Sequence, residues 1–103
     1  MTDLEKKFHR EMVEVYQTTK KEVKYNAVRF LQLISEKGGV AAAKQLVMKD
    51  GGTEGFGTLH MAGRLDLTVE YHVVQPEYAS LFTPEEIATS KKRLKDHGFL
   101  GEL

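Results

Sequence analysis

The chain has 103 residues, of which 41% are hydrophobic and 29% charged, and this composition predicts one globular domain. The absence of cysteine excludes disulfides and thiolate metal sites. Basic and acidic residues balance at a net charge of zero, which disfavours nucleic-acid binding because phosphates call for a basic surplus. No apolar run is long enough to cross a membrane and no signal peptide begins the chain, so we expect a cytoplasmic protein.

An amphipathic helix is predicted from about residue 3. Apolar side chains recur at spacings of three and four, and Asp3 is placed to cap the first turn. The apolar stripe stays in phase to residue 36, so one long helix or two shorter helices fit the pattern. A break near residues 24–26 is preferred, because Asn26 suits the cap of a second helix and because the remaining chain is too short to cover one helix of that length.

Glycines divide the middle of the chain. Gly38 and Gly39 end the second helix, since glycine readily takes the left-handed conformation that follows a helix. A short alanine-rich helix is predicted from Val40 to about Met48, and the glycines of residues 51–57 then form a bend. This stretch matches neither a phosphate loop, which requires a lysine after its last glycine, nor the spacing of a dinucleotide-binding fingerprint.

Residues 65–74 fit two patterns. Apolar and polar residues alternate there as in a half-buried strand, but Val69 and Val73 also fall on one face of a helix capped by Asp66. A strand requires a partner, and no second strand pattern exists elsewhere in the chain. The helix is therefore preferred.

The clearest predicted element is a helix that begins after Thr83. The sequence Thr83-Pro84-Glu85-Glu86 provides an N-cap hydroxyl, a proline at the first helical position and a glutamate at the third, which together form a capping box. Gly98 followed by an apolar residue is typical of a Schellman ending. We therefore expect an all-α fold, a compact bundle of five or six helices in a single domain of residues 1–103.

A cluster of polar residues between positions 60 and 72 is the first candidate site. Two histidines and two carboxylates are typical of metal or acid–base sites, but no spacing such as HExxH is present. A salt bridge from Arg64 to Asp66 or Glu70 accounts for the same residues. We therefore expect no catalytic residue, no metal and no cofactor, and we interpret Arg64, Asp66, Glu70 and His72 as an interaction or structural motif.

A second candidate lies at residues 30–49, where two helices joined by a glycine turn resemble a helix-turn-helix. Lys44, Gln45 and Lys49 would then contact DNA. Helical hairpins with glycine turns are common in small bundles, however, and the zero net charge disfavours this function.

Four segments, spread over nearly the whole chain, carry a resemblance to known proteins. They are Tyr25-Asn26-Ala27-x-Arg29-Phe30, Gly63-Arg64-Leu65-Asp66-Leu67-Thr68-Val69-Glu70, Pro76-Glu77-Tyr78 and Leu81-Phe82-Thr83-x-Glu85-Glu86. In this order they resemble an uncharacterised family of small bacterial helical proteins of similar length. The resemblance implies a free-standing protein and brings no activity, cofactor or catalytic residue.

Three functions are therefore considered. The preferred one is a small non-enzymatic protein of a bacterium or its phage that acts through protein–protein interaction, with another protein or with itself as a homodimer, and without a membrane partner. The alternative is a DNA-binding regulator that uses residues 30–49. The third is a hydrolase or metal-dependent activity around His60, Asp66, Glu70 and His72.

Overall fold

The computed structural model describes residues 2–49 and 55–99, and all regular secondary structure in these ranges is helical. The α-helices there are α1 (Asp3–Thr18), α2 (Val28–Lys37), α3 (Gly39–Val47), α4 (Phe56–Met61), α5 (Val69–Val73) and α6 (Pro84–Asp96). Shorter elements are a π-helix, η1 (Thr19–Val23), and two 3-10 helices, η2 (Leu65–Leu67) and η3 (Pro76–Leu81). The all-α prediction is confirmed.

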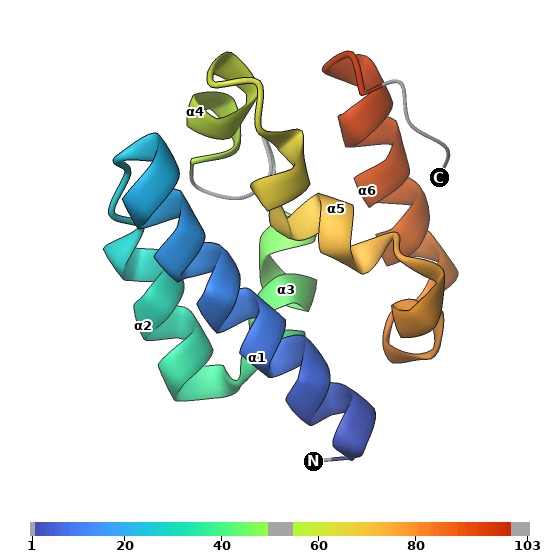
Figure 1. Ribbon diagram of the computed structural model, residues 1–103. Helices are drawn as coiled ribbons and strands as arrows, with labels where there is room; N and C mark the ends of the chain where they lie inside the picture. Colours follow the sequence, from blue (N-terminus) through green and yellow to red (C-terminus); the bar gives the residue numbers. More distant parts are fainter. Residues whose placement is uncertain (1, 50–54, 100–103) are drawn as a thin grey trace.

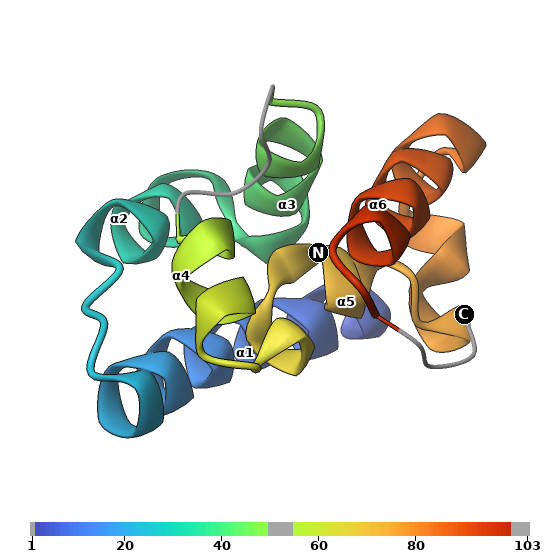
Figure 2. The ribbon, with the colours of Figure 1, turned by 90° about the horizontal axis from the view of Figure 1, so that it is seen from above.

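Helix α3 packs against α1, α2, α5 and α6, and in the view from above it lies between α2 and α6 (Figure 2). Its buried residues include Gly39, Ala42 and Ala43, whose small size lets neighbouring helices approach closely. Helix α5 lies between α1 and α6, as the view from above also shows (Figure 2). The radius of gyration is 12.4 Å, close to the value of about 13 Å that is typical of a compact domain of this size.

Aromatic side chains form the centre of the main core. Phe8 on α1 is fully buried and meets Tyr78 and Phe82 edge-on, with ring centroids 4.9 and 5.2 Å apart. A smaller cluster joins α4 and α6 to the end of α5, and its buried members are Phe56, Val74 and Leu94. The core therefore ties the first helix to the segment that precedes α6.

The N-terminus of α1 is capped by a residue that the sequence analysis passed over. Thr2 Oγ1 accepts a hydrogen bond from the backbone N–H of Glu5 at 3.2 Å, and the Glu5 carboxylate accepts from the N–H of Thr2 at 2.9 Å. The prediction of Asp3 as the cap is therefore wrong by one residue. Threonine and aspartate are both good caps, and the glutamate three positions after Thr2 decides between them.

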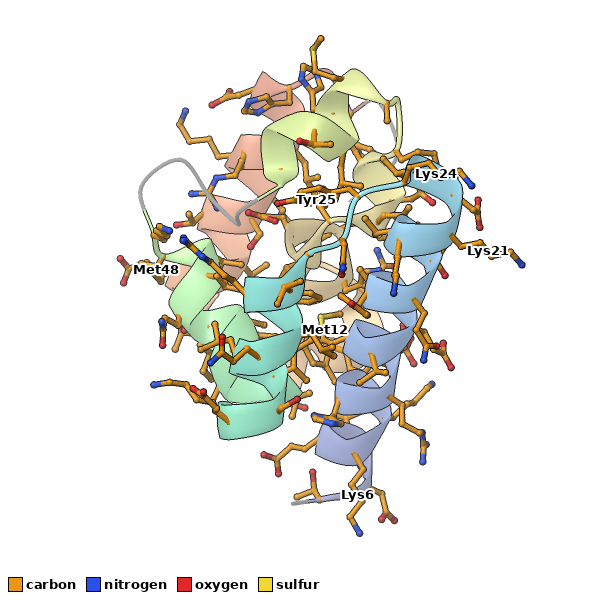
Figure 3. The ribbon with its side chains drawn as sticks, turned by 90° about the vertical axis from the view of Figure 1, so that its left-hand side faces the viewer. Lys6, Met12, Lys21, Lys24, Tyr25 and Met48 are labelled. Atoms are coloured by element: carbon orange, nitrogen blue, oxygen red, sulfur yellow. The ribbon has the colours of Figure 1, made fainter. Side chains whose placement is uncertain are left out.

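The predicted break between the first two helices is confirmed at residues 24–27. Helix α1 continues into η1, and the residue that follows this π-helix, Lys24, has a left-handed φ of 64°. Lys24 and Tyr25 mark the turn in Figure 3. The predicted role of Asn26 as a cap is wrong, because Ala27 occupies the N-cap position of α2 without a side-chain hydrogen bond. Asn26 Oδ1 instead accepts from the Tyr16 hydroxyl at 2.5 Å.

Gly38 and Gly63, both with positive φ, follow the ends of α2 and α4. Gly38, with φ of 86°, is the single residue between α2 and α3, so α3 begins and ends one residue earlier than predicted. Gly63, with φ of 71°, follows α4, and the next N–H, that of Arg64, donates to the Leu59 carbonyl at 2.8 Å. The predicted bend at residues 51–57 lies mostly outside the described residues.

Residues 65–74 are helical, as preferred, and contain no strand. They form η2 and α5 rather than one helix. Thr68 caps α5 because its hydroxyl accepts from the N–H of Tyr71 at 3.2 Å. The prediction of Asp66 as the cap is wrong, since Asp66 lies inside η2 and its carboxylate binds Arg64.

Helix α6 follows its prediction at both ends. Thr83 Oγ1 accepts from the N–H of Glu86 at 3.1 Å, and the Glu86 carboxylate accepts from the N–H of Thr83 at 2.8 Å. At the other end, Gly98 has a φ of 86° and the N–H of Phe99 donates to the Leu94 carbonyl at 3.0 Å, which is the Schellman arrangement. Both ends are determined by residues that are neighbours in the sequence.

Candidate functional site

The four residues of the predicted interaction motif do not form one cluster. Arg64, Asp66 and His72 line a common groove beside α1, whereas Glu70 points into the protein and contacts α6. The split follows from the local structure: η2 and α5 differ in helical type and are separated by Thr68, so their side chains do not continue one helical face.

Arg64 joins two segments that are far apart in the sequence. Its Nε and Nη2 donate to the two carboxylate oxygens of Asp66 at 3.1 and 3.2 Å, and its Nη1 donates to Glu22 Oε1 at 2.7 Å. Asp66 first, and then Glu22, raises the pKa of Arg64 above its ordinary value. The predicted salt bridge between Arg64 and Asp66 is present. The second carboxylate that binds Arg64 is that of Glu22 in η1, not that of Glu70.

His72 lies against α1 and is largely buried, with 14% of its side chain exposed. Its Nδ1 is 3.4 Å from Glu11 Oε1, without the geometry of a hydrogen bond. Both ring nitrogens of His72 and the Oε2 atom of Glu11 are buried and have no hydrogen-bond partner among the described residues. Buried polar atoms in this state cost about 1–3 kcal/mol each, so these two side chains are the least satisfied polar pair of the groove.

Burial lowers the pKa of His72 below its ordinary value of 6.5, although the Glu11 carboxylate opposes this shift. The unfolded chain therefore binds more protons than the folded chain once the pH falls toward and below that value. We expect the free energy of unfolding to decrease from about pH 6.5 downward, by up to about 1.4 kcal/mol per pH unit from this group.

Urea unfolding at a series of pH values measures this dependence. His72→Gln should remove that part of the slope, whereas His60→Gln, a change at an exposed histidine, should leave it in place. A His72→Gln slope equal to that of the wild-type protein would show that His72 is not the responsible group.

The groove itself has a volume of about 310 Å³. Helix α1 forms one wall, and the chain that leads from α4 into α5 forms the other; the two run beside each other in Figures 1 and 2. Its lining residues are Glu11, Glu14, Val15, Thr18, Arg64, Asp66, Leu67 and His72. Three carboxylates thus face one guanidinium, and burial keeps the histidine neutral near neutral pH, so the groove is acidic.

Glu70 takes part in a buried ion pair that the sequence analysis missed. Its side chain is fully buried, and Oε2 accepts from Arg93 Nη1 at 2.9 Å. The same guanidinium donates to the carbonyl of Val47 at 3.0 Å and to that of Lys49 at 3.3 Å. Arg93 of α6 therefore holds α5 and the C-terminal end of α3 together. A weak signal existed: Glu70 follows Val69 in an otherwise apolar segment, where an acidic side chain requires a partner.

The three candidate DNA contacts differ in their exposure and in their partners within the protein. Lys44 forms a salt bridge with Glu86 of α6 at 2.9 Å and lies 5.5 Å from the centre of the Phe82 ring. Gln45 and Lys49 are exposed, and the Lys49 carbonyl accepts from Arg93. A helix-turn-helix has a turn of three to four residues, whereas Gly38 alone separates α2 from α3.

The histidines and carboxylates of the third hypothesis are also separated. His60 stacks against His97, Asp66 binds Arg64, Glu70 binds Arg93, and His72 faces Glu11. Within residues 2–49 and 55–99, no three histidine or acidic side chains stand close enough to share a metal ion. The constellation on which that hypothesis depends is therefore not assembled in the described part of the chain.

The fold places this chain among small all-α proteins, and comparison with known proteins does not narrow this class further. No protein-family model, curated protein or solved structure that was compared with the chain matches it. The resemblance to an uncharacterised bacterial family stays an expectation. In the described ranges, no helix combines the length and apolar character needed to cross a membrane.

Proposed function

We propose that this protein is a non-enzymatic interaction protein of the bacterial or phage cytoplasm, and that the groove between α1 and residues 64–72 receives a lysine or arginine side chain of its partner. The observation that carries the proposal is the pair Glu11 and His72. Their buried polar atoms have no hydrogen-bond partner in the described structure, and they lie in a groove that carries an excess of carboxylates.

Charge supports a basic partner. Glu11 and Glu14 on α1 attract a cation, while Arg64 is already neutralised by Asp66 and Glu22. His72 does not repel a cation, because burial keeps it neutral near neutral pH. An ammonium or guanidinium group that reaches Glu11 forms a charge-assisted hydrogen bond, which contributes about 1.5–3 kcal/mol.

Size supports one long side chain rather than a docked helix. The volume of about 310 Å³ lies near the lower end of the range of small-ligand pockets, about 300–1,000 Å³. Val15 and Leu67 supply apolar surface for the methylene stem of a lysine or arginine, whose charged end then meets the carboxylates.

A peptide-binding assay tests this function. Two sets of fluorescent peptides with random flanks are compared by anisotropy, one with a central lysine or arginine and the other with a central glutamate. We expect the basic set to bind and the acidic set not to bind. Glu14→Lys should weaken binding by roughly tenfold or more, because the reversal of charge removes an attraction of about 1 kcal/mol in water at 4 Å and adds a repulsion of similar size, and tenfold corresponds to about 1.4 kcal/mol.

Glu36→Lys is the matched control. Glu36 is also an exposed glutamate on a helix, but it lies on α2, and its carboxylate accepts a hydrogen bond from Gln32 of the same helix. If both variants bind the basic peptides equally weakly, the loss of affinity comes from the change in net charge and not from the groove. A second copy of this chain is the other occupant to test, by sedimentation. If a side chain of that copy enters the groove, the wild-type protein and Glu36→Lys self-associate and Glu14→Lys does not.

DNA binding through residues 30–49 is the weaker proposal. Lys44 is engaged by Glu86, and the broad inner face of α3 is buried. A mobility shift at low salt that disappears as the salt concentration rises would support DNA binding. The absence of any shift at low salt would eliminate it.

A further inference from the structure

Two histidines from distant parts of the sequence meet at one hollow of the surface. His60 lies in α4 and His97 directly follows α6, and their ring centroids are 5.0 Å apart with the ring planes at 81°. Both side chains are exposed. The hollow has a volume of about 450 Å³, and Asp66 and Phe99 also contribute to its lining.

The separation of the two rings fits a shared metal ion. A zinc–nitrogen bond is about 2.1 Å long, and an imidazole nitrogen lies about 1 Å from its ring centre, so two imidazoles on one tetrahedral ion have centroids about 5 Å apart. The observed distance between the centroids of His60 and His97 is 5.0 Å. The centroid separation therefore matches that of two imidazoles on one ion, and rotation of the two side chains has to turn a nitrogen of each ring toward that ion.

A hydrogen bond determines which nitrogen of His97 is free to bind a metal ion. His97 Nδ1 lies 2.8 Å from the carbonyl oxygen of Arg93. A carbonyl only accepts, so Nδ1 carries the proton, and the lone pair of the neutral ring is on Nε2. Metal-binding histidines commonly donate their other N–H to a carbonyl in this way. Phe56, whose ring centroid is 4.7 Å from that of His97, packs against the ring and further limits its rotation.

We propose that His60 and His97 bind one divalent transition-metal ion through one imidazole nitrogen each, with water or an external ligand in the remaining positions. Asp66 is not counted as a ligand, because both of its carboxylate oxygens accept from Arg64. Imidazole ligands favour Cu²⁺, Ni²⁺ and Zn²⁺ over Mg²⁺, which prefers oxygen. The bound ion joins α4 to the end of α6. This proposal departs from the expectation of no metal and is independent of the peptide groove.

Calorimetric titration of the untagged protein with Zn²⁺, Ni²⁺ and Cu²⁺, and with Mg²⁺ as the negative control, tests the site. We expect one equivalent of each transition metal to bind. His60→Gln and His97→Gln should each weaken this binding roughly tenfold or more. His9→Gln, at a histidine on α1 outside the hollow, is the matched control and should bind as the wild-type protein does. Circular dichroism confirms that each variant is folded.

The location of the ion provides a second readout. Paramagnetic Cu²⁺ should broaden the NMR signals of residues around the hollow, such as Gly63, Gly98 and Phe99, before those of α2. The proposal is overturned if the wild-type protein binds no transition metal. It is also overturned if His60→Gln and His97→Gln bind as tightly as the wild-type protein, which would mean that the rings only stack.

Discussion

Arg93→Ala should lower the free energy of unfolding by about 3–5 kcal/mol, the usual effect of removing one partner of a buried ion pair. The guanidinium is 2.9 Å from the carboxylate of Glu70, whose side chain is fully buried. Alanine removes the guanidinium that faces this buried carboxylate in the low-dielectric interior. It also removes the donor to the carbonyls of Val47 and Lys49 at the end of α3. Urea unfolding followed by circular dichroism measures the change.

Two further variants make this result specific. Lys92→Ala is the control, since Lys92 is on the same helix and pairs with Asp96 at the surface, with 77% of the lysine side chain exposed. It should unfold at nearly the wild-type urea concentration. The double variant Glu70→Leu with Arg93→Met removes both charges, and it should recover much of the loss because no buried charge remains unpaired. A small effect of Arg93→Ala alone would contradict a structural role for the pair.

Gly39→Ala should destabilise the protein by about 1–3 kcal/mol through overpacking. A Cβ atom at this position would lie 2.7 Å from the Cα of His9, a backbone atom of α1 that cannot rotate away. The N–H of Gly39 also donates to His9 Nδ1 at 2.9 Å, so helices that separate to make room lose this hydrogen bond as well. The midpoint of thermal or urea unfolding reports the loss.

Gly57→Ala is the matched control for this substitution. Gly57 also lies in a helix, α4, but a Cβ there has no heavy atom within 4 Å. Alanine is a better helix former than glycine by up to about 1 kcal/mol, so Gly57→Ala should leave stability unchanged or raise it. Equal destabilisation by the two variants would show that the contact between α1 and α3 is not as close as described.

The elements that could be predicted from the sequence are those determined by neighbouring residues. The capping box at Thr83 and the Schellman ending at Gly98 each involve residues within six positions of one another, and both are present. The break between the first two helices also follows from the sequence, but the predicted cap, Asn26, instead binds Tyr16 of the preceding helix. When a side chain has two potential hydrogen-bond partners, tertiary packing determines which of them it binds.

In the candidate site, too, contacts between neighbours in the sequence are predictable and contacts between distant residues are not. The Arg64–Asp66 bridge spans two positions and was predicted, whereas Glu22 is 42 residues from Arg64 in the sequence and was not. The sequence places Glu70 beside the residues of the surface motif, whereas its partner Arg93 lies on another helix. Long-range pairs leave no periodic signal in one sequence, so the groove could not be distinguished from a scaffold motif before the helices were placed.

One measurement tests the central claim about the groove most directly, the mapping of a bound basic peptide by NMR on ¹⁵N-labelled protein. The largest shifts are expected at Glu11, Glu14, Arg64 and His72, and they should fade as salt rises because screening weakens exposed charge pairs. The same peptide with glutamate in place of its basic residue should cause no shift. Shifts centred on α2 and α3 instead, or equal shifts with the acidic peptide, would contradict the assignment of the groove as the binding site.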